Sequence, residues 1–216
     1  METIQVCGID VFIEESESYL QINDIAPSMM RQVREALAAK YPGFELWLCF
    51  HNSTPPDEEV SAIGAELLDD SIDMRISRQD FTACGTHANI SLLKLEDFDA
   101  FAALHDQLID PDFYWTSPLL RADWDIWLIH VLRDGDEIIG YALTMIPKTR
   151  DYGEVFAIEA PNSDLKKALL ASACAGAFEA GKNQVVYMAD TPEEQSWADG
   201  LGFRVTGYYK GYRVRL

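Results

Sequence analysis

The sequence lacks any long apolar run. It has no stretch of about 20 apolar residues, the length that a helix needs to span a bilayer. Its first ten residues, METIQVCGID, also lack the basic segment followed by an apolar segment that marks a signal peptide. We therefore expect no membrane contact and a cytoplasmic location. With 216 residues, 48% of them hydrophobic, the chain can bury a core in one or two domains.

Positive charge is scarce. The chain has 17 Lys and Arg against 36 Asp and Glu, a formal net charge of −19. Nucleic acids and anionic membrane surfaces are bound through clustered Lys and Arg, so this balance argues against both. The negative excess suits a cationic small molecule such as an amine, although it can equally serve solubility alone.

Cysteine pairs are absent. The four cysteines, at positions 7, 49, 84 and 174, form no CxxC motif. This spacing predicts no structural disulfide and no metal site, and free buried thiols are the simpler interpretation. His87, close to Cys84, completes no recognisable nucleophilic or metal-binding set.

Apolar periodicity predicts an α/β chain in which strands and helices alternate. The segment 111–123 is aromatic and predicted to be irregular, and a hairpin is expected around Asp134-Gly135-Asp136. The expected strands cover residues 3–13, 17–24, 44–50, 72–76, 90–93, 124–133, 137–146, 154–160, 184–188 and 204–216. The expected helices cover residues 28–41, 56–69, 95–108, 162–180 and 192–201.

Two segments have the same order of elements. From Tyr19 and from Tyr152, the chain is predicted to form strand, helix, strand and helix. Ala-Pro precedes the first helix of each segment, at positions 26–27 and 160–161, and Thr-Pro introduces the second, at 54–55 and 191–192. Chance agreement is the alternative, because Pro and acidic residues commonly begin helices. The matching order favours a structural repeat.

Four motifs follow one another in the C-terminal half: ISLL at 90–93, the hairpin GDEIIGYA at 135–142, KALL at 167–170 and LGF at 201–203. In the order and spacing of these motifs, roughly residues 90–216 resemble the GNAT superfamily of N-acetyltransferases. The resemblance implies a mixed sheet flanked by helices. It also implies a complete GNAT-like domain at 90–216 preceded by a truncated one at 1–85, as in tandem members.

The same resemblance implies an acetyl-CoA-dependent N-acetyltransferase that acts on a small amine or amino-acid-like acceptor. In this fold the pantetheine arm lies between two diverging parallel strands, and the pyrophosphate sits on a helix N-terminus, where free amides and the helix dipole favour anions. The residues that correspond to the acetyl-CoA site are Ile158, Ala160, Ser163, Asp164, Leu165, Lys166 and Lys167.

The phosphate loop departs from the family pattern. The family usually has Arg/Gln-x-x-Gly-x-Gly/Ala, whereas residues 161–168 are PNSDLKKA, with Asp164 and Lys166 in the two glycine places. Glycine lets a backbone approach phosphate closely, and a carboxylate there repels it. The alternative is that Asn162 and Asp164 are a plain N-cap and an acidic first turn. If the loop is used, we expect the Leu165 amide to be one of the donors.

The catalytic residues depart as well. Ala198 stands where the family usually has its Tyr acid, so we consider Tyr209 as a substitute, with Tyr208 and Tyr212 as neighbours. Glu159, at the end of a strand, is the candidate base, and Glu154 and His130 are weaker choices. Strand alternation places Glu159 on one face with Val155 and Ala157.

Aromatic residues beside carboxylates offer a site for a cationic amine. The residues concerned are 113–115 (FYW), Trp124 and Trp127, next to Asp110, Asp112, Asp123 and Asp125. Ordinary core packing is the alternative. Two other hypotheses stay open for the whole chain: a GNAT-like ligand-binding or protein-interaction module without catalysis, and an unrelated acidic α/β protein. A homodimer also stays open.

Overall fold

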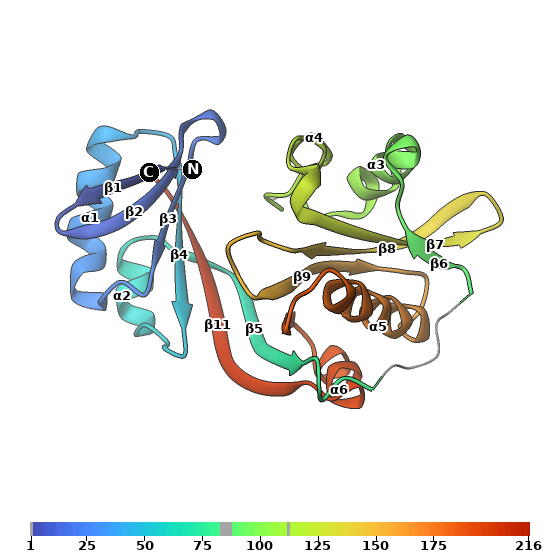
Figure 1. Ribbon diagram of the computed structural model, residues 1–216. Helices are drawn as coiled ribbons and strands as arrows, with labels where there is room; N and C mark the ends of the chain where they lie inside the picture. Colours follow the sequence, from blue (N-terminus) through green and yellow to red (C-terminus); the bar gives the residue numbers. More distant parts are fainter. Residues whose placement is uncertain (1, 83–87, 112) are drawn as a thin grey trace. The chain divides into compact units, whose positions relative to one another are not determined.

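The computed structural model describes residues 2–82, 88–111 and 113–216 (Figure 1). These form two compact units. Unit 1 comprises Met1–Asp73 and Thr206–Leu216, and unit 2 comprises Met74–Val205. No helix of the described residues is long and apolar enough to cross a membrane. Among the same residues, Cys49 and Cys174 are buried free thiols, whereas Cys7 is exposed.

Unit 1 is a sheet covered by two α-helices. Its strands follow the order β1-β2-β3-β4-β11-β5, with β3 and β4 parallel and β11 antiparallel to β4. The β1–β2 hairpin turns at Cys7 and Gly8, which both have positive φ, so the expected strand 3–13 is two strands. The elements are β1 (Glu2–Val6), β2 (Ile9–Glu14), η1 (Glu15–Glu17), β3 (Tyr19–Asn23), α1 (Pro27–Lys40), β4 (Glu45–His51), α2 (Asp57–Ala62), β5 (Glu66–Ser77) and β11 (Arg204–Arg215).

Unit 2 has strands in the order β5-β10-β9-β8-β7-β6, and its described pairs are antiparallel except for β9 and β10. The helices α3 and α5 cover opposite faces. Trp127, Ile129 and Val131 of β7 belong to the core that α3 covers, whereas His130 between them meets Gly176 of α5. The elements are β6 (Ile90–Leu92), η2 (Leu95–Asp97), α3 (Phe98–Leu108), α4 (Ser117–Ala122), η3 (Trp124–Ile126), β7 (Trp127–Asp134), β8 (Glu137–Met145), β9 (Tyr152–Glu159), α5 (Ser163–Glu179), β10 (Gln184–Ala189) and α6 (Pro192–Leu201).

Both halves of the sequence contain a strand-helix-strand-helix-strand run. It is β3-α1-β4-α2-β5 in the first half of the sequence and β9-α5-β10-α6-β11 in the second. The last strand of each run leaves its own half: β5 ends next to β10, and β11 pairs with β4. The compact units therefore differ from the domains expected at 1–85 and 90–216, since the chain from Thr206 onward groups with unit 1. That the first half is a partial copy of the GNAT fold stays a prediction.

Other expected segments differ from the structure as well. The helix expected at 56–69 ends at Ala62, because Gly64 adopts a φ of 67° and the chain continues as the strand β5. Within the irregular segment 111–123, residues 117–122 form the short helix α4, which begins with Ser117 and Pro118. The mixed sheet flanked by helices that the sequence predicted is confirmed.

Candidate functional site

The parallel strands β9 and β10 separate before β9 ends. Their register runs from Tyr152–Gln184 to Val155–Tyr187 and stops there. Residues 156–159 continue β9, but within the described chain they pair only with β8. The backbone N–H and C=O groups of residues 156–159 that face β10 consequently have no strand partner. The opening lies at the carboxyl end of parallel strands, where open α/β sheets bind ligands.

A β-bulge at Phe156 changes the face of the sheet to which the side chains at the end of β9 point. In the ladder, Leu143 lies opposite Ala157 and Thr144 lies opposite Val155, so Phe156 is an extra residue. Because of it, Phe156, Ala157 and Glu159 share one face, and Val155 lies on the other. The expectation that Val155, Ala157 and Glu159 share a face was therefore wrong, since simple alternation ignores the extra residue.

Glu159 faces the α3 side of the sheet. It lies opposite Tyr141, which belongs to the core under α3. Its carboxylate forms an ion pair with the Lys166 ammonium at 3.4 Å, and the two side chains are 33% and 26% exposed. The predicted base is thus at the open end of β9, half-buried and paired with a predicted cofactor residue.

Tyr141 beside Glu159 is already engaged. Nε2 of the buried His105 lies 2.9 Å from the Trp115 carbonyl oxygen, so this nitrogen carries the proton. Nδ1 of His105 then accepts from the Tyr141 hydroxyl at 3.0 Å. Burial raises the pKa of Tyr141, and the charge of Glu159 adds to this rise. The pKa of His105 is lowered by burial. This pair is a fixed structural contact without a free proton donor.

The first turn of α5 is partly capped by the protein itself. The Asn162 side chain accepts a hydrogen bond from the Leu165 amide at 3.0 Å, so this amide is not the free donor that we expected. The amides of Ser163 and Asp164 have no hydrogen-bond partner among the described residues. The plain N-cap and the free donors therefore coexist at this helix end.

The tips of α5 and α6 meet. Each helix follows one of the two separating strands, and the Ser163 hydroxyl donates to the Glu193 carboxylate at 2.6 Å. Thr191 and Glu194 form a capping box at the start of α6. Lys167 points to the same helix, because a Cβ built on Gly200 would lie 3.3 Å from its Nζ. A direct hydrogen bond thus links the two sides of the strand opening.

The remaining predicted cofactor residues border the same opening. Ile158 is buried at the end of β9, on the face opposite to Glu159. Ala160 is half-buried between β9 and α5. The structure consequently brings Glu159 and all of the predicted cofactor residues together in unit 2.

Tyr187 was not selected from the sequence. It is the last β10 residue paired with β9 and is only 5% exposed. Burial raises the pKa of Tyr187, and the charges of Glu194, Asp190 and Glu159 raise it further. A Tyr within the apolar strand QVVYMA is typical of a packing residue. Only its position at the end of the β9–β10 ladder indicates that it borders the candidate site.

An aromatic cluster lies on the α3 face. Trp127 packs edge-on against Trp115 at 5.0 Å and against Phe156 at 5.6 Å between ring centroids. The indole Nε1 of Trp127 is buried without a hydrogen-bond partner in the described chain. The cluster includes two of the predicted aromatic residues, and the bulged Phe156 connects it to the strand that ends in Glu159. Asp112, Cys84 and His87 lie outside the described residues.

His130, a weaker candidate base, packs under α5. A Cβ on Gly176 would stand 2.5 Å from the His130 ring, so the glycine is what admits the imidazole. Burial lowers the pKa of His130 to about 4. Its position beneath a helix is that of a core residue.

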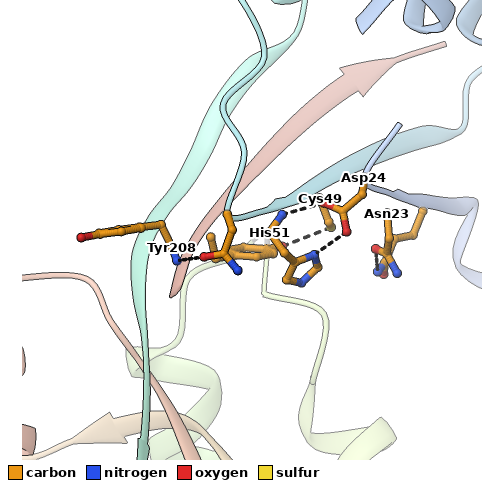
Figure 2. Close-up of polar contacts among 8 residues, drawn as sticks. Asn23, Asp24, Cys49, His51 and Tyr208 are labelled. Carbon is orange, nitrogen blue, oxygen red and sulfur yellow. Dashed lines mark hydrogen bonds and ion pairs between the residues drawn. The ribbon is translucent and has the colours of Figure 1, made fainter. Parts of the chain in front are cut away.

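The equivalent place in unit 1 is closed. β3 and β4 stay paired through Asn23–Cys49, and the Asp24 amide adds a further bond to the Cys49 carbonyl at 2.8 Å. Figure 2 shows the Asp24 carboxylate reaching His51, where it accepts from the backbone amide at 2.7 Å and lies 3.2 Å from Nδ1. No strand opening exists here, so only unit 2 offers one among the described residues.

Tyr209 belongs to this closed region. It lies opposite His51 in the β4–β11 ladder, and its hydroxyl donates to Cys49 Sγ at 3.1 Å. Burial and the neighbouring Cys49 raise the pKa of Tyr209 far above its usual value. The structure therefore does not place Tyr209 in the unit that holds Glu159, and its proton is engaged. Tyr208 and Tyr212 lie in unit 1 as well.

Comparison with known proteins identifies the architecture. No family model and no curated protein matches the chain. Among solved structures, a GCN5-related N-acetyltransferase from Kribbella flavida is similar at a TM-score of 0.67 and 13% identity, over 99% of this chain and 89% of that one. This chain has the GNAT fold.

Two further structures agree with the GNAT fold. A tandem GNAT protein from the clavulanic acid biosynthesis pathway matches at a TM-score of 0.64 and 12% identity, over 96% of this chain and 78% of that one. A functionally unknown conserved protein from Staphylococcus epidermidis matches at a TM-score of 0.72 and 9% identity, over 99% of this chain and 94% of that one. The GNAT resemblance stated from the sequence is confirmed at the level of fold.

The opening fits the two halves of an acyl-CoA differently. The unpaired end of β9 offers backbone groups to an extended amide-containing arm, as a missing strand would. The α5 tip fits a pyrophosphate poorly, because Asn162 occupies one amide and the carboxylates of Asp164 and Glu193 stand at the same turn. Among the described residues, no group of three or more His, Cys, Asp or Glu is placed to hold a metal ion.

Proposed function

We propose that unit 2 is an N-acyltransferase that takes an acetyl-CoA-type thioester as donor and a small amine as acceptor. One observation carries this: β9 loses β10 after Val155 and then leads directly into α5. A pantetheine arm contains two amides in an extended chain. Such an arm can form hydrogen bonds with the free edge of residues 156–159 as a neighbouring strand would.

Glu159 is the proposed base. Its carboxylate lies on the face that also holds the Trp115–Trp127–Phe156 cluster, where a cationic amine can rest against aromatic rings. The ammonium passes one proton to this carboxylate, and the neutral amine attacks the thioester carbonyl carbon, so a C–N bond forms while the C–S bond breaks. The second nitrogen proton goes to the departing sulfur, which leaves as the thiol. The leaving sulfur is a thiolate-type group, a weak base compared with an alkoxide, since even a Cys thiol has a pKa of only about 8.5. Its departure needs no strong acid, which makes the missing Tyr at Ala198 tolerable.

Calorimetric titration with acetyl-CoA tests the donor. We expect saturable binding with one site per chain, because the closed strands of unit 1 offer no second opening. Thiol release on a panel of small amines then tests transfer. Absence of binding at millimolar donor would remove the proposal, and two equivalent sites would contradict the assignment to unit 2.

A ligand-binding module without turnover is the second candidate. The self-capped α5 tip and the Ser163–Glu193 bond favour it, because both occupy groups that a donor would otherwise contact. Donor binding without thiol release on any amine would support this alternative.

A further inference from the structure

The start of α5 offers little to a pyrophosphate. Of its first three amides, that of Leu165 is bound to Asn162. The amides of Ser163 and Asp164 have no partner among the described residues, but the Ser163 hydroxyl holds the Glu193 carboxylate at the same turn. The position that would need the closest backbone approach is Asp164, which has a side chain and a negative charge. Phosphate binding at a helix start depends on free amides and a short approach.

Charge around the same turn is unfavourable as well. The carboxylates of Asp164 and Glu193 stand there, and Asp190 and Glu194 lie at the start of α6. Of the two nearby ammonium groups, Lys166 pairs with Glu159, and Lys167 points toward Gly200 of α6, so two positive charges stand against four carboxylates. A group with two or more negative charges would meet net repulsion at this turn.

The strand opening beside this turn has no such obstacle. Residues 156–159 keep their β10 side unpaired, and an uncharged arm needs only backbone hydrogen bonds there. We infer that, if the proposed function holds, unit 2 recognises its donor through the uncharged acyl-pantetheine half and gains no affinity from the nucleotide diphosphate. The donor class is thus an acyl-pantetheine thioester, with or without a nucleotide attached.

Parallel calorimetric titrations with acetyl-pantetheine, acetyl-4′-phosphopantetheine and acetyl-CoA test this inference. We expect acetyl-pantetheine to bind within about 3-fold of acetyl-CoA, or more tightly. Acetyl-CoA affinity should also rise with added salt, because screening weakens repulsion. A preference of about 10-fold or more for acetyl-CoA would overturn the inference and leave the proposed function standing. Failure of all three to bind at millimolar concentration would overturn both.

A pair of variants makes the test sharper. Asp164→Gly combined with Glu193→Gln should raise acetyl-CoA affinity by about 10-fold and leave acetyl-pantetheine affinity within about 2-fold. Glu179→Gln, at the other end of α5, is the matched control, because it removes a charge far from the first turn. Equal gains for both donors in the double variant would contradict a diphosphate-specific effect.

Discussion

The carbonyl oxygen of Glu159 occupies the space beside Gly140: a Cβ atom built on Gly140 would lie 2.6 Å from it. Gly140 is the glycine of the GDEIIGYA hairpin, on the strand β8 that supports the open end of β9. The glycine therefore lets two backbones approach at the point where the candidate site begins. This contact gives a physical reason for a residue that the sequence offered only as part of a family pattern.

Gly140→Ala should consequently damage unit 2. The added methyl group meets backbone, which cannot rotate away, so we expect a loss of about 1–3 kcal/mol in unfolding free energy. Donor affinity should fall too, because Glu159 and Ala160 must shift. Urea unfolding and acetyl-pantetheine titration measure both effects. Gly200→Ala is the control: its Cβ would meet only the flexible end of Lys167, and stability should stay equal or rise. Equal behaviour of the two variants would refute the role given to Gly140.

Glu159→Gln keeps the shape of the side chain and removes its basicity. We expect thiol release to slow by about 100-fold or more, with donor affinity changed by less than about 3-fold. Stability should change little, since the Lys166 pair is partly exposed and such pairs contribute about 0–1 kcal/mol. Glu154→Gln, on the paired part of the same strand, is the control and should retain activity. A similar loss in both variants would show a general effect of charge, and full activity of Glu159→Gln would exclude it as the base.

Asp24→Ala tests whether unit 1 takes part in donor binding. Asp24 has a φ of 52° and its carboxylate accepts the His51 amide, so the change strains the backbone and removes the bond. We expect a loss of about 1–3 kcal/mol in unfolding free energy. Asp24→Gly should cost less, because glycine tolerates this φ. Donor affinity of both variants should equal that of the parent chain. A clear drop in affinity for the folded variants would implicate unit 1 in the site.

The buried His130 should make stability depend on pH. Its pKa is about 4 in the folded protein and about 6.5 when unfolded, so the unfolded chain binds more protons between these values. The contribution of the neutral His130 to the unfolding free energy is therefore fully present above pH 6.5. It is lost as the pH falls toward 4, by about 2 kcal/mol between pH 7 and pH 5. Urea unfolding at both pH values should show a smaller difference for His130→Gln than for the parent chain. An unchanged difference would mean that other groups carry the pH dependence.

Periodic segments with clear ends were predictable. The helix expected at 28–41 is α1 at Pro27–Lys40, and the one expected at 162–180 is α5 at Ser163–Glu179. Both have apolar positions at helical spacing and a recognisable start. The segment 56–69 was not predictable, because the left-handed Gly64 and the strand after it depend on pairing with distant residues. Local propensity says little about a strand that crosses from one unit to the other.

Several residues of the candidate site were named from the sequence, but their geometry was not, and their role in donor binding stays a prediction. Glu159 and the residues of the α5 start were named from the sequence, and the structure gathers them. The bulge at Phe156, which decides where Glu159 points, leaves no mark in the sequence around it. Tyr209 was placed by element order alone, and its strand joins unit 1 through the ladder with β4.

The sequence by itself determined the order of elements, the acidic character of the chain and the absence of glycine at the start of α5. Tertiary structure alone decided which half has an opening. Asp24 extends the β3–β4 ladder, whereas Val155 and Tyr187 end the one between β9 and β10. Both halves have the same Ala-Pro and Thr-Pro signals, so local chemistry does not separate them. The difference arises from hydrogen bonds between strands far apart in the chain, whose register is set by the packing around them.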